Sequence, residues 1–169
     1  MVYGQTEVTW LITAIFNEDA WERKGSVGKV VEDMEMEIWD EDGNALKAGA
    51  TGEIMAKSIR CVSGYWNNKE DTDKVIKNGW LYTGDIGHFD NGFLKITDRK
   101  KDILITPGGD NISPVKIEND LLKIEFIEQA LVYGDNKPFL VALLVLNNDK
   151  KNIDSQSINN EIEKINNKL

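Results

Sequence analysis

The chain has 169 residues, of which 41% are hydrophobic and 29% charged, and its net charge is -9. This length suits one domain or two small ones and excludes a large multi-domain enzyme. The acidic balance excludes a nucleic-acid-binding surface, which needs clustered Lys and Arg, but a local basic run such as Arg99-Lys100-Lys101 still allows nucleotide binding. One cysteine, Cys61, and one histidine, His88, exclude an internal disulfide and a Cys/His zinc site.

No apolar run is long enough to span a bilayer, and the residues after Met1 lack the basic and apolar regions of a signal peptide. We therefore expect a cytoplasmic location, with a peripheral membrane contact left open.

Residues 1–97 are predicted to be rich in β-strands. Between residues 34 and 38, methionine and isoleucine alternate with glutamate, which is the pattern of a half-buried strand. Asp90-Asn91-Gly92 indicates a tight hairpin turn, because Asn and Gly adopt positive φ at low cost. Several short strands with regular turns favour a barrel-like or sandwich subdomain. The predicted strands are at residues 34–38, 52–56, 80–89 and 93–96, with a short helix at 70–76.

Residues 98–169 are predicted to form a small α+β domain, so that the whole chain is of the α+β class. Ser113 is placed to be the N-cap of a helix and Pro114 its first residue. A last amphipathic helix is indicated by apolar residues at 158, 162, 165 and 169. Since no Gly or Asn cap follows Leu169, we expect a truncated chain. The predicted strands are at 103–105, 129–133 and 139–146, and a loop is expected at 107–110.

Three segments combine residues that carry chemistry. Residues 3–7 place a ring, a hydroxyl and a carboxylate together, which suits a base, a phosphate and Mg²⁺, although an ordinary tail would look similar. Asp85 follows Thr83-Gly84, and an aspartate in this setting can accept hydrogen bonds from the two hydroxyls of a ribose. The alternative interpretation is that it simply closes a turn. Residues 97–102 are a charged run, which by itself is most often a solvated linker.

Taken together and in this order, the three segments resemble the motif series of the adenylate-forming (AMP-binding) superfamily, which includes acyl-CoA synthetases, nonribosomal peptide synthetase adenylation domains and luciferases. The resemblance covers essentially the whole chain. Residues 109–114 and 137–142 look most like the long-chain fatty acid CoA ligase branch. The matching motifs are Tyr3-Gly4-Gln5-Thr6-Glu7, Trp80-Leu81-Tyr82-Thr83-Gly84-Asp85 and Asp98-Arg99-Lys100-Lys101-Asp102.

The resemblance implies a two-step reaction in which a fatty acid and ATP give acyl-AMP, and coenzyme A then displaces AMP. It implies ATP/AMP, Mg²⁺ and coenzyme A as ligands, and a hinge between the end of the large AMP-binding domain (1–97) and the small C-terminal domain (98–169). The implied roles are adenine stacking for Tyr3, an α-phosphate contact for Thr6, Mg²⁺ for Glu7, ribose for Asp85 with Arg99, the hinge for Lys101, and the coenzyme A channel for Gly108 and Gly109.

Some family features are missing from this sequence. Many relatives have a lysine after the hinge where this chain has Ile105, and the upstream phosphate loop and most of the acyl pocket are absent. Met1 lies almost directly before the first motif, which indicates a chosen start point or a split gene. The adenylating lysine is expected beyond residue 169, because none of four late lysines stands in its context: Lys150, Lys151, Lys164 and Lys168.

Three hypotheses follow from the sequence. The first is a fatty acid CoA ligase fragment that is inactive alone. The second is a nucleotide-binding or interaction module that completes a partner chain carrying the missing half. The third is a non-enzymatic β-rich domain with chance motifs. An apolar face left exposed where the missing part would pack also favours self-association.

Overall fold

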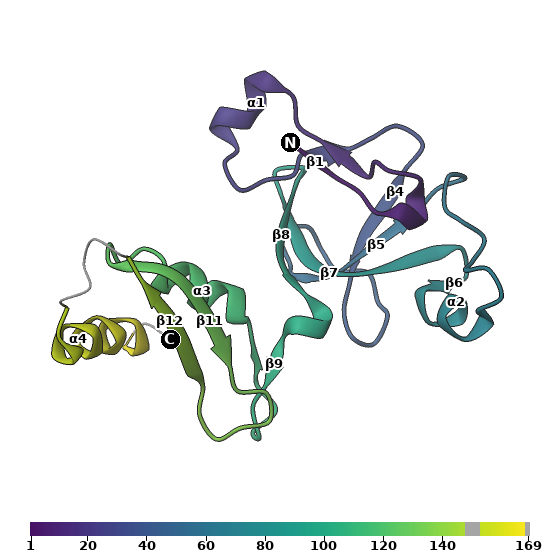
Figure 1. The fold of residues 1–169 in the computed structure, drawn as a ribbon. Helices are drawn as coiled ribbons and strands as arrows, with labels where there is room; N and C mark the ends of the chain where they lie inside the picture. Colours follow the sequence, from purple (N-terminus) through teal and green to yellow (C-terminus); the bar gives the residue numbers. More distant parts are fainter. Residues whose placement is uncertain (148–152, 168–169) are drawn as a thin grey trace. The chain divides into compact units, whose positions relative to one another are not determined.

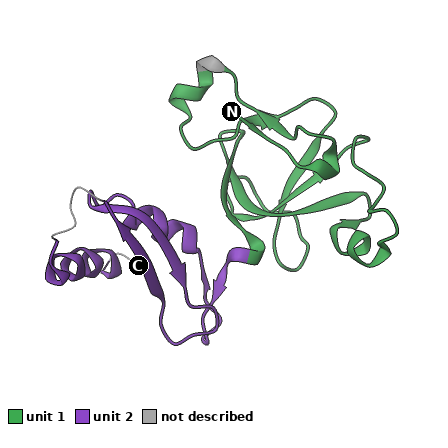
Figure 2. Ribbon diagram, in the orientation of Figure 1, with its two compact units in different colours: residues 1–101 green, residues 102–169 purple. Residues whose placement is uncertain are grey.

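The computed structural model of the chain describes residues 1–147 and 153–167 (Figure 1). Figure 2 shows its two compact units, Met1–Lys101 and Asp102–Leu169. A division after Thr97 is predicted from the sequence, whereas the strand containing that residue continues to Arg99 and the two units divide after Lys101. Both units contain helices and strands, so the predicted α+β class is confirmed.

Unit 1 is built on two antiparallel sheets. The first has the order β1-β2-β3, and the second has the order β4-β5-β7-β6 with β8 paired to β7. A bridge between Gly28 and Leu94 joins the segment before β3 to β8, which curls the strands around one core. The elements are β1 (Val2–Tyr3), η1 (Thr6–Val8), β2 (Thr13–Ala14), α1 (Asn17–Glu22), β3 (Lys29–Val30), β4 (Glu35–Trp39), β5 (Gly52–Lys57), α2 (Lys69–Val75), β6 (Ile76–Lys77), β7 (Trp80–Asp90) and β8 (Phe93–Arg99).

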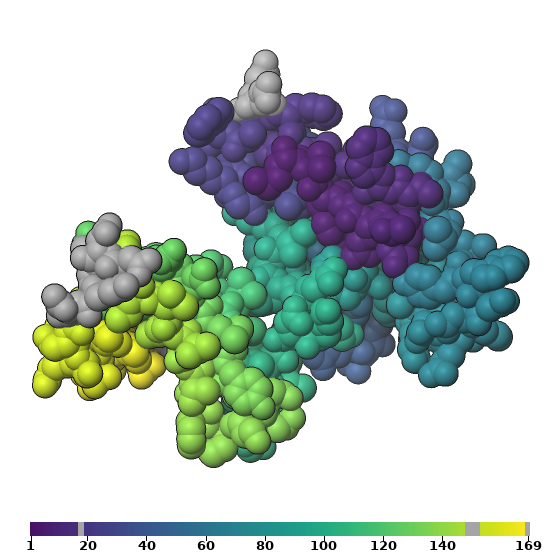
Figure 3. Space-filling model, viewed as in Figure 1, coloured from purple at the N-terminus to yellow at the C-terminus, as the bar shows by residue number. Residues whose placement is uncertain are grey.

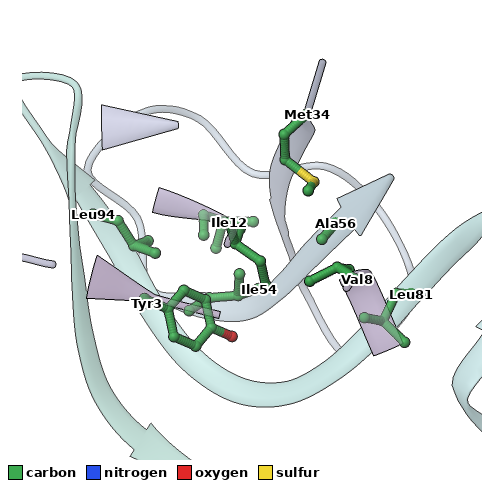
Figure 4. Packing of buried hydrophobic residues seen from close by; sticks show 9 residues of the cluster. Tyr3, Val8, Ile12, Met34, Ile54, Ala56, Leu81 and Leu94 are labelled. Atoms are coloured by element: carbon green, nitrogen blue, oxygen red, sulfur yellow. The ribbon is translucent and has the colours of Figure 1, made fainter. Parts of the chain in front are cut away.

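The core of unit 1 draws side chains from both sheets and from the N-terminal segment (Figure 4). Ile12, Ile54 and Leu94 are fully buried there. Figure 3 shows the dark purple N-terminal segment against the teal residues of the same unit. The first residues of the chain are therefore part of the packed core and not a loose tail. The buried members are Tyr3, Val8, Ile12, Met34, Ile38, Ile54, Ala56, Leu81 and Leu94.

Unit 2 packs two helices against one face of a two-stranded ribbon. Ser113 caps the first helix as predicted, since its hydroxyl accepts from the Lys116 amide at 3.1 Å. The core contains Ile117, Leu121 and Val132, while alternate residues such as Leu131 and Leu143 lie exposed on the other face. The elements are η2 (Lys100–Asp102), which crosses the division, and β9 (Leu104–Ile105), β10 (Asn111–Ile112), α3 (Pro114–Leu121), β11 (Ile127–Tyr133), β12 (Val141–Leu146) and α4 (Ser155–Asn166).

Most of the longer predicted elements are confirmed, including the hairpin of β7 and β8 around Asn91-Gly92. The last helix is confirmed as α4, with Asp154 as its N-cap. Leu169 and three of the late lysines, Lys150, Lys151 and Lys168, lie outside the described residues. In the part of the chain that the structure describes, no helix is both long and apolar enough to cross a bilayer.

The dependence of unit 1 on its core can be tested with two isoleucines of different burial. Ile54 is fully buried on β5 and Ile59 is 95% exposed just beyond it. Ile54→Ala is expected to lower the free energy of unfolding by about 2–5 kcal/mol through lost burial and a cavity. Ile59→Ala is expected to change it by less than about 0.5 kcal/mol.

All five tryptophans lie at or before residue 80, so tryptophan fluorescence during chemical denaturation reports on unit 1 alone. Equal effects of the two substitutions would contradict the core described above.

Candidate functional site

A bulge in the central strand β7 sets the position of Asp85. Glu53 pairs with Ile86 and Met55 pairs with Tyr82, so one residue of β5 faces three of β7. Gly84, in the middle of the bulge, has φ +71°, a conformation that favours glycine. The interpretation of Thr83-Gly84-Asp85 as a turn is therefore wrong: the segment lies inside an 11-residue strand, and the bulge re-aims its side chains.

Hydrogen bonds from both strands hold the bulge in place. The Thr83 hydroxyl donates to the Ile54 carbonyl at 2.7 Å and accepts from the Asp85 amide at 3.1 Å. The Gly84 amide donates to Glu53 Oε1 at 3.2 Å. Because regular ladder bonds are interrupted at a bulge, these side chains substitute for them.

Asp85 is only 5% exposed, and its carboxylate accepts hydrogen bonds from three side chains. The Tyr3 hydroxyl donates to Oδ2 at 2.7 Å, and Gln5 Nε2 donates to the same oxygen at 2.8 Å. Arg99 Nε, from the residue directly opposite on β8, lies 2.9 Å from Oδ1. A buried carboxylate is stable only when it is paired and hydrogen-bonded in this way.

Tyr3 belongs to the core as well as to this cluster. The residue is only 9% exposed, so little of the ring is available for stacking on a ligand in this structure. Burial, and then the hydrogen bond to Asp85, raises the pKa of the Tyr3 hydroxyl. The hydroxyl therefore stays protonated and acts as a permanent donor to Asp85.

The segment after Tyr3 folds back tightly on itself. A Cβ on Gly4 would collide with the carbonyl group of Trp10, so only glycine fits this approach. Thr9 and Trp10 both have positive φ, at 53° and 119°, which is strained for residues other than glycine. The fold-back presents the side chains of this segment along one side of a pocket.

This pocket has a volume of about 850 Å³ and lies within unit 1. Three residues singled out in the sequence analysis line it: Thr6, Glu7 and Arg99. Tyr3 and Asp85 are not among the lining residues, but both contact the side chain of Gln5, which does line the pocket. The other lining residues are Gly4, Gln5, Thr9, Trp10 and Thr83.

Glu7 is held by a tyrosine from a distant segment. The Tyr65 hydroxyl donates to Glu7 Oε1 at 2.7 Å, and this bond, with a smaller effect of desolvation, raises the pKa of Tyr65 to about 12. Among the described residues no group of three acidic, histidine or cysteine side chains surrounds a metal position. A single carboxylate fits Mg²⁺, which commonly takes one or two carboxylates and otherwise phosphate oxygens and water.

The basic run at the end of unit 1 is tied to buried acids. Arg99 pairs with Asp85, and Lys100 Nζ lies 2.8 Å from Glu53 Oε2. Lys101 follows in η2 with an exposed side chain. The first half of the run is thus anchored to the sheet of unit 1, and the interpretation of a wholly solvated linker is wrong.

The two glycines singled out for the coenzyme A channel belong to unit 2, in the loop between β9 and β10. Gly109 has φ +90°, which favours glycine, and its amide donates to the Thr106 carbonyl at 2.9 Å. Gly108 is exposed, and a Cβ there would meet its neighbours only at ordinary contact distance, 3.5 Å. Backbone conformation thus explains Gly109 but not Gly108.

Some residues of the site were missed by the sequence analysis. Gln5 stands inside a motif that was noticed, but no role was assigned to it. Glu53 could have been found from the sequence, because it directly precedes the apolar run Ile54-Met55-Ala56, and a carboxylate in such a strand must be paired if the strand is buried. No sequence signal pointed to Tyr65, because its partner Glu7 lies 58 positions away in the chain.

Comparison with known proteins identifies the class to which this fold and site belong. The sequence model of the AMP-binding enzyme family matches residues 1–66, and that of the AMP-binding enzyme C-terminal domain matches residues 101–169. The chain belongs to the AMP-binding enzyme family, with one matched domain model in each half.

The proteins to which the chain is similar include CoA ligases named for different acids. A long-chain-fatty-acid–CoA ligase of Mycobacterium tuberculosis is 41% identical over 123 residues, which is 72% of this chain and 19% of that protein. The indoleacetate–CoA ligase of Aromatoleum aromaticum is 37% identical over 79% of this chain and 26% of its own length. The chain therefore spans about a fifth to a quarter of these relatives.

A similar solved structure is the o-succinylbenzoate CoA synthetase of Bacillus subtilis in complex with an acyl-adenylate intermediate. It matches 96% of this chain and 34% of its own, with a TM-score of 0.82 and 32% sequence identity. The same synthetase has also been solved with ATP and a magnesium ion, with a TM-score of 0.78.

The hydrogen bond between Tyr65 and Glu7 makes a pH-dependent prediction. Because the folded-state pKa of Tyr65 is raised to about 12, the bond stabilises the fold fully below the ordinary tyrosine value and is lost as the pH rises through the folded value. Glu7→Gln is expected to lower the pKa of Tyr65 toward the ordinary value of about 10.

The measurement is the ultraviolet absorbance of the phenolate during an alkaline titration, with a Tyr65→Phe variant subtracted to isolate this residue. Glu35→Gln, which removes an exposed carboxylate elsewhere in unit 1, is the control. An unchanged Tyr65 titration in Glu7→Gln would show that the bond is not formed in solution.

Proposed function

We propose that this chain supplies the ribose-binding and phosphate-facing side of the ATP site, and the hinge, of an AMP-forming ligase that joins a fatty acid to coenzyme A. The observation that carries the proposal is the buried Asp85 carboxylate, held by Tyr3, Gln5 and Arg99 beside a pocket of about 850 Å³. Such a carboxylate is suited to accept hydrogen bonds from two vicinal hydroxyls.

In the first half-reaction, a carboxylate oxygen attacks the α-phosphorus of ATP, and the bond to the departing pyrophosphate breaks. In this proposal Asp85, oriented by Arg99, holds the ribose, and the Thr6 hydroxyl donates to an α-phosphate oxygen. Tyr3 acts chiefly through its hydroxyl on Asp85 and offers the adenine the small exposed part of its ring. The catalytic contribution of these groups is positioning and charge stabilisation.

Glu7, with one oxygen engaged by Tyr65, would hold Mg²⁺ together with the phosphates of the nucleotide. When bound, the ion neutralises charge on the phosphate oxygens and so favours departure of the pyrophosphate. Tyr65 keeps the Glu7 carboxylate in one orientation toward the pocket.

In the second half-reaction, the thiol of coenzyme A attacks the acyl carbon and the bond to AMP breaks. Reorientation of unit 2 about Lys101 would bring the loop of Gly108 and Gly109 to the thiol-bearing arm, where residues without a Cβ leave room. The identity of 41% to a long-chain-fatty-acid–CoA ligase supports a fatty acid as the acid. The Aromatoleum relative makes an aromatic acid the competing substrate class.

A second candidate function is that of a nucleotide-binding module, because the pocket and the Asp85 cluster lie within unit 1 alone. In this alternative the chain completes a partner polypeptide that carries the remaining part of the site. The test is acyl-CoA formation by the purified chain from ATP, coenzyme A and either palmitate or indoleacetate, alone and mixed with a polypeptide bearing the phosphate loop. We expect no product from the chain alone; turnover by the chain alone would contradict its role as a partial site.

Nucleotide binding by the chain tests the ribose contact directly. Asp85→Asn is expected to weaken AMP binding by about tenfold or more, since a hydrogen bond to a charged group contributes roughly 1.5–3 kcal/mol. Asp90→Asn is the matched control, because Asp90 lies on the same strand and pairs with Lys95 at the surface.

Binding is measured from the chemical-shift changes that AMP causes in NMR spectra of each variant, after tryptophan fluorescence has shown that unit 1 is folded. Equal AMP affinity in Asp85→Asn and wild type would overturn the proposed ribose site.

A further inference from the structure

Glu53 is a buried carboxylate to which the proposed function assigns no role. It lies on β5 in the sheet of unit 1 and is only 8% exposed. Leaving such a charge unpaired in the interior is strongly unfavourable, so its partners reveal what it is placed to hold. Each of its two oxygens has a different partner.

The first oxygen holds the bulge that aims Asp85. Oε1 accepts from the amide of Gly84 at 3.2 Å, at the point where β5 and β7 lose their regular pairing. Gly84 directly precedes Asp85, so the position of this amide sets the start of the aspartate backbone. Glu53 therefore stabilises the conformation that turns Asp85 toward Tyr3 and Arg99.

The second oxygen holds the chain where unit 1 ends. Oε2 lies 2.8 Å from Lys100 Nζ, and Lys100 is followed by Lys101, the last residue of unit 1. Its neighbour Arg99 is held by Asp85 in the same way. Two consecutive cations are thus fastened to two buried acids on adjacent strands, and Glu53 contacts both the bulge and the basic run.

We propose that Glu53 is a positioning residue that couples the ribose-binding Asp85 to the hinge, by holding the Gly84 amide with one oxygen and Lys100 with the other. The inference rests on the proposed function for the ribose contact, whereas the contact to Lys100 can be tested without any ligand. Movement of Lys100 away from Glu53 would leave the buried Glu53 carboxylate with one partner fewer. A change in conformation at the hinge would therefore alter the contact of Glu53 to the Gly84 amide in the bulge.

The test compares Glu53→Gln with Glu35→Gln. Glu35 is the matched control, because it lies on the neighbouring strand β4 and pairs with Lys57 at the surface, 3.3 Å away. The glutamine at position 53 keeps the size of the side chain but loses its charge, and its amide nitrogen cannot accept from Gly84 or Lys100.

The first readout is the ratio of the affinities for AMP and for 2′,3′-dideoxy-AMP, which lacks the hydroxyls that Asp85 would bind. We expect wild type and Glu35→Gln to prefer AMP, and Glu53→Gln to lose at least about threefold of that preference, because misplacing a hydrogen-bonded carboxylate weakens only the contacts to the hydroxyls. A purely structural defect would lower both affinities alike.

The second readout is limited proteolysis with trypsin, which cleaves after Lys and Arg. Cleavage needs local release of the backbone, so the loss of an anchor accelerates it only near that anchor. In Glu53→Gln we expect cleavage after Arg99, Lys100 and Lys101 to be faster by about fivefold, as for an anchoring contact worth roughly 1 kcal/mol. Cleavage after Lys77 should be unchanged.

The outcomes separate the two proposals. If wild type shows no preference for AMP over the dideoxy compound, the proposed function fails. If wild type shows the preference but Glu53→Gln keeps it, or if trypsin cleavage at the basic run is unchanged, the coupling role of Glu53 is overturned. Should Glu53→Gln fail to fold by tryptophan fluorescence, Lys100→Met carries the second readout, and unchanged cleavage after Lys101 in that variant overturns the inference.

Discussion

A buried negative charge at Asp85 is the constraint on which much of unit 1 depends. Only 7% of its side chain is exposed, so donors within the protein must replace most of the lost hydration. They come from segments that are distant in sequence: Tyr3 and Gln5 at the start of the chain and Arg99 at the end of β8. The N-terminal segment, the bulge in β7 and the last residue of β8 therefore have to be in place together.

The same requirement links stability to function. A side chain fixed by three donors on two oxygens is already oriented before any ligand arrives, so little ordering remains to be done on binding. Tyr3 illustrates this link, because its ring contributes to the core while its hydroxyl orients the carboxylate. Core and site are not separate parts of this unit, and a variant in one is expected to affect the other.

Local patterns in the sequence were sufficient for most of the longer elements. The alternation around Met36, the Asn91-Gly92 turn and the Ser113-Pro114 helix start each contain their own signal. Two-residue strands such as β1 (Val2–Tyr3) do not, because two residues have no periodicity. The bulge at Gly84 was also unpredictable, since it exists only in the register between β7 and β5, whose contacts at the bulge join residues 29 and 31 positions apart.

The candidate site also contains residues that the sequence reveals and residues that it does not. Asp85 and Arg99 were singled out from motifs, and the structure brings them to within 2.9 Å of each other. The residues that hold the site in place could not be identified from motifs, because their contacts join positions far apart in the sequence. Tyr65 is 58 residues from Glu7, and Lys100 is 47 residues from Glu53. A supporting residue has no motif of its own. It is recognised only when the fold shows which charge or hydroxyl it contacts.

The anchoring of Arg99 and Lys100 has a consequence for the connection between the units. With both residues fastened to β-sheet acids, only Lys101 and the residues directly after it remain as a tether between unit 1 and unit 2. A flexible linker lets its ends wander by a distance that grows with the square root of its length. A tether this short instead leaves only a few backbone dihedral angles through which the orientation of one unit can change relative to the other.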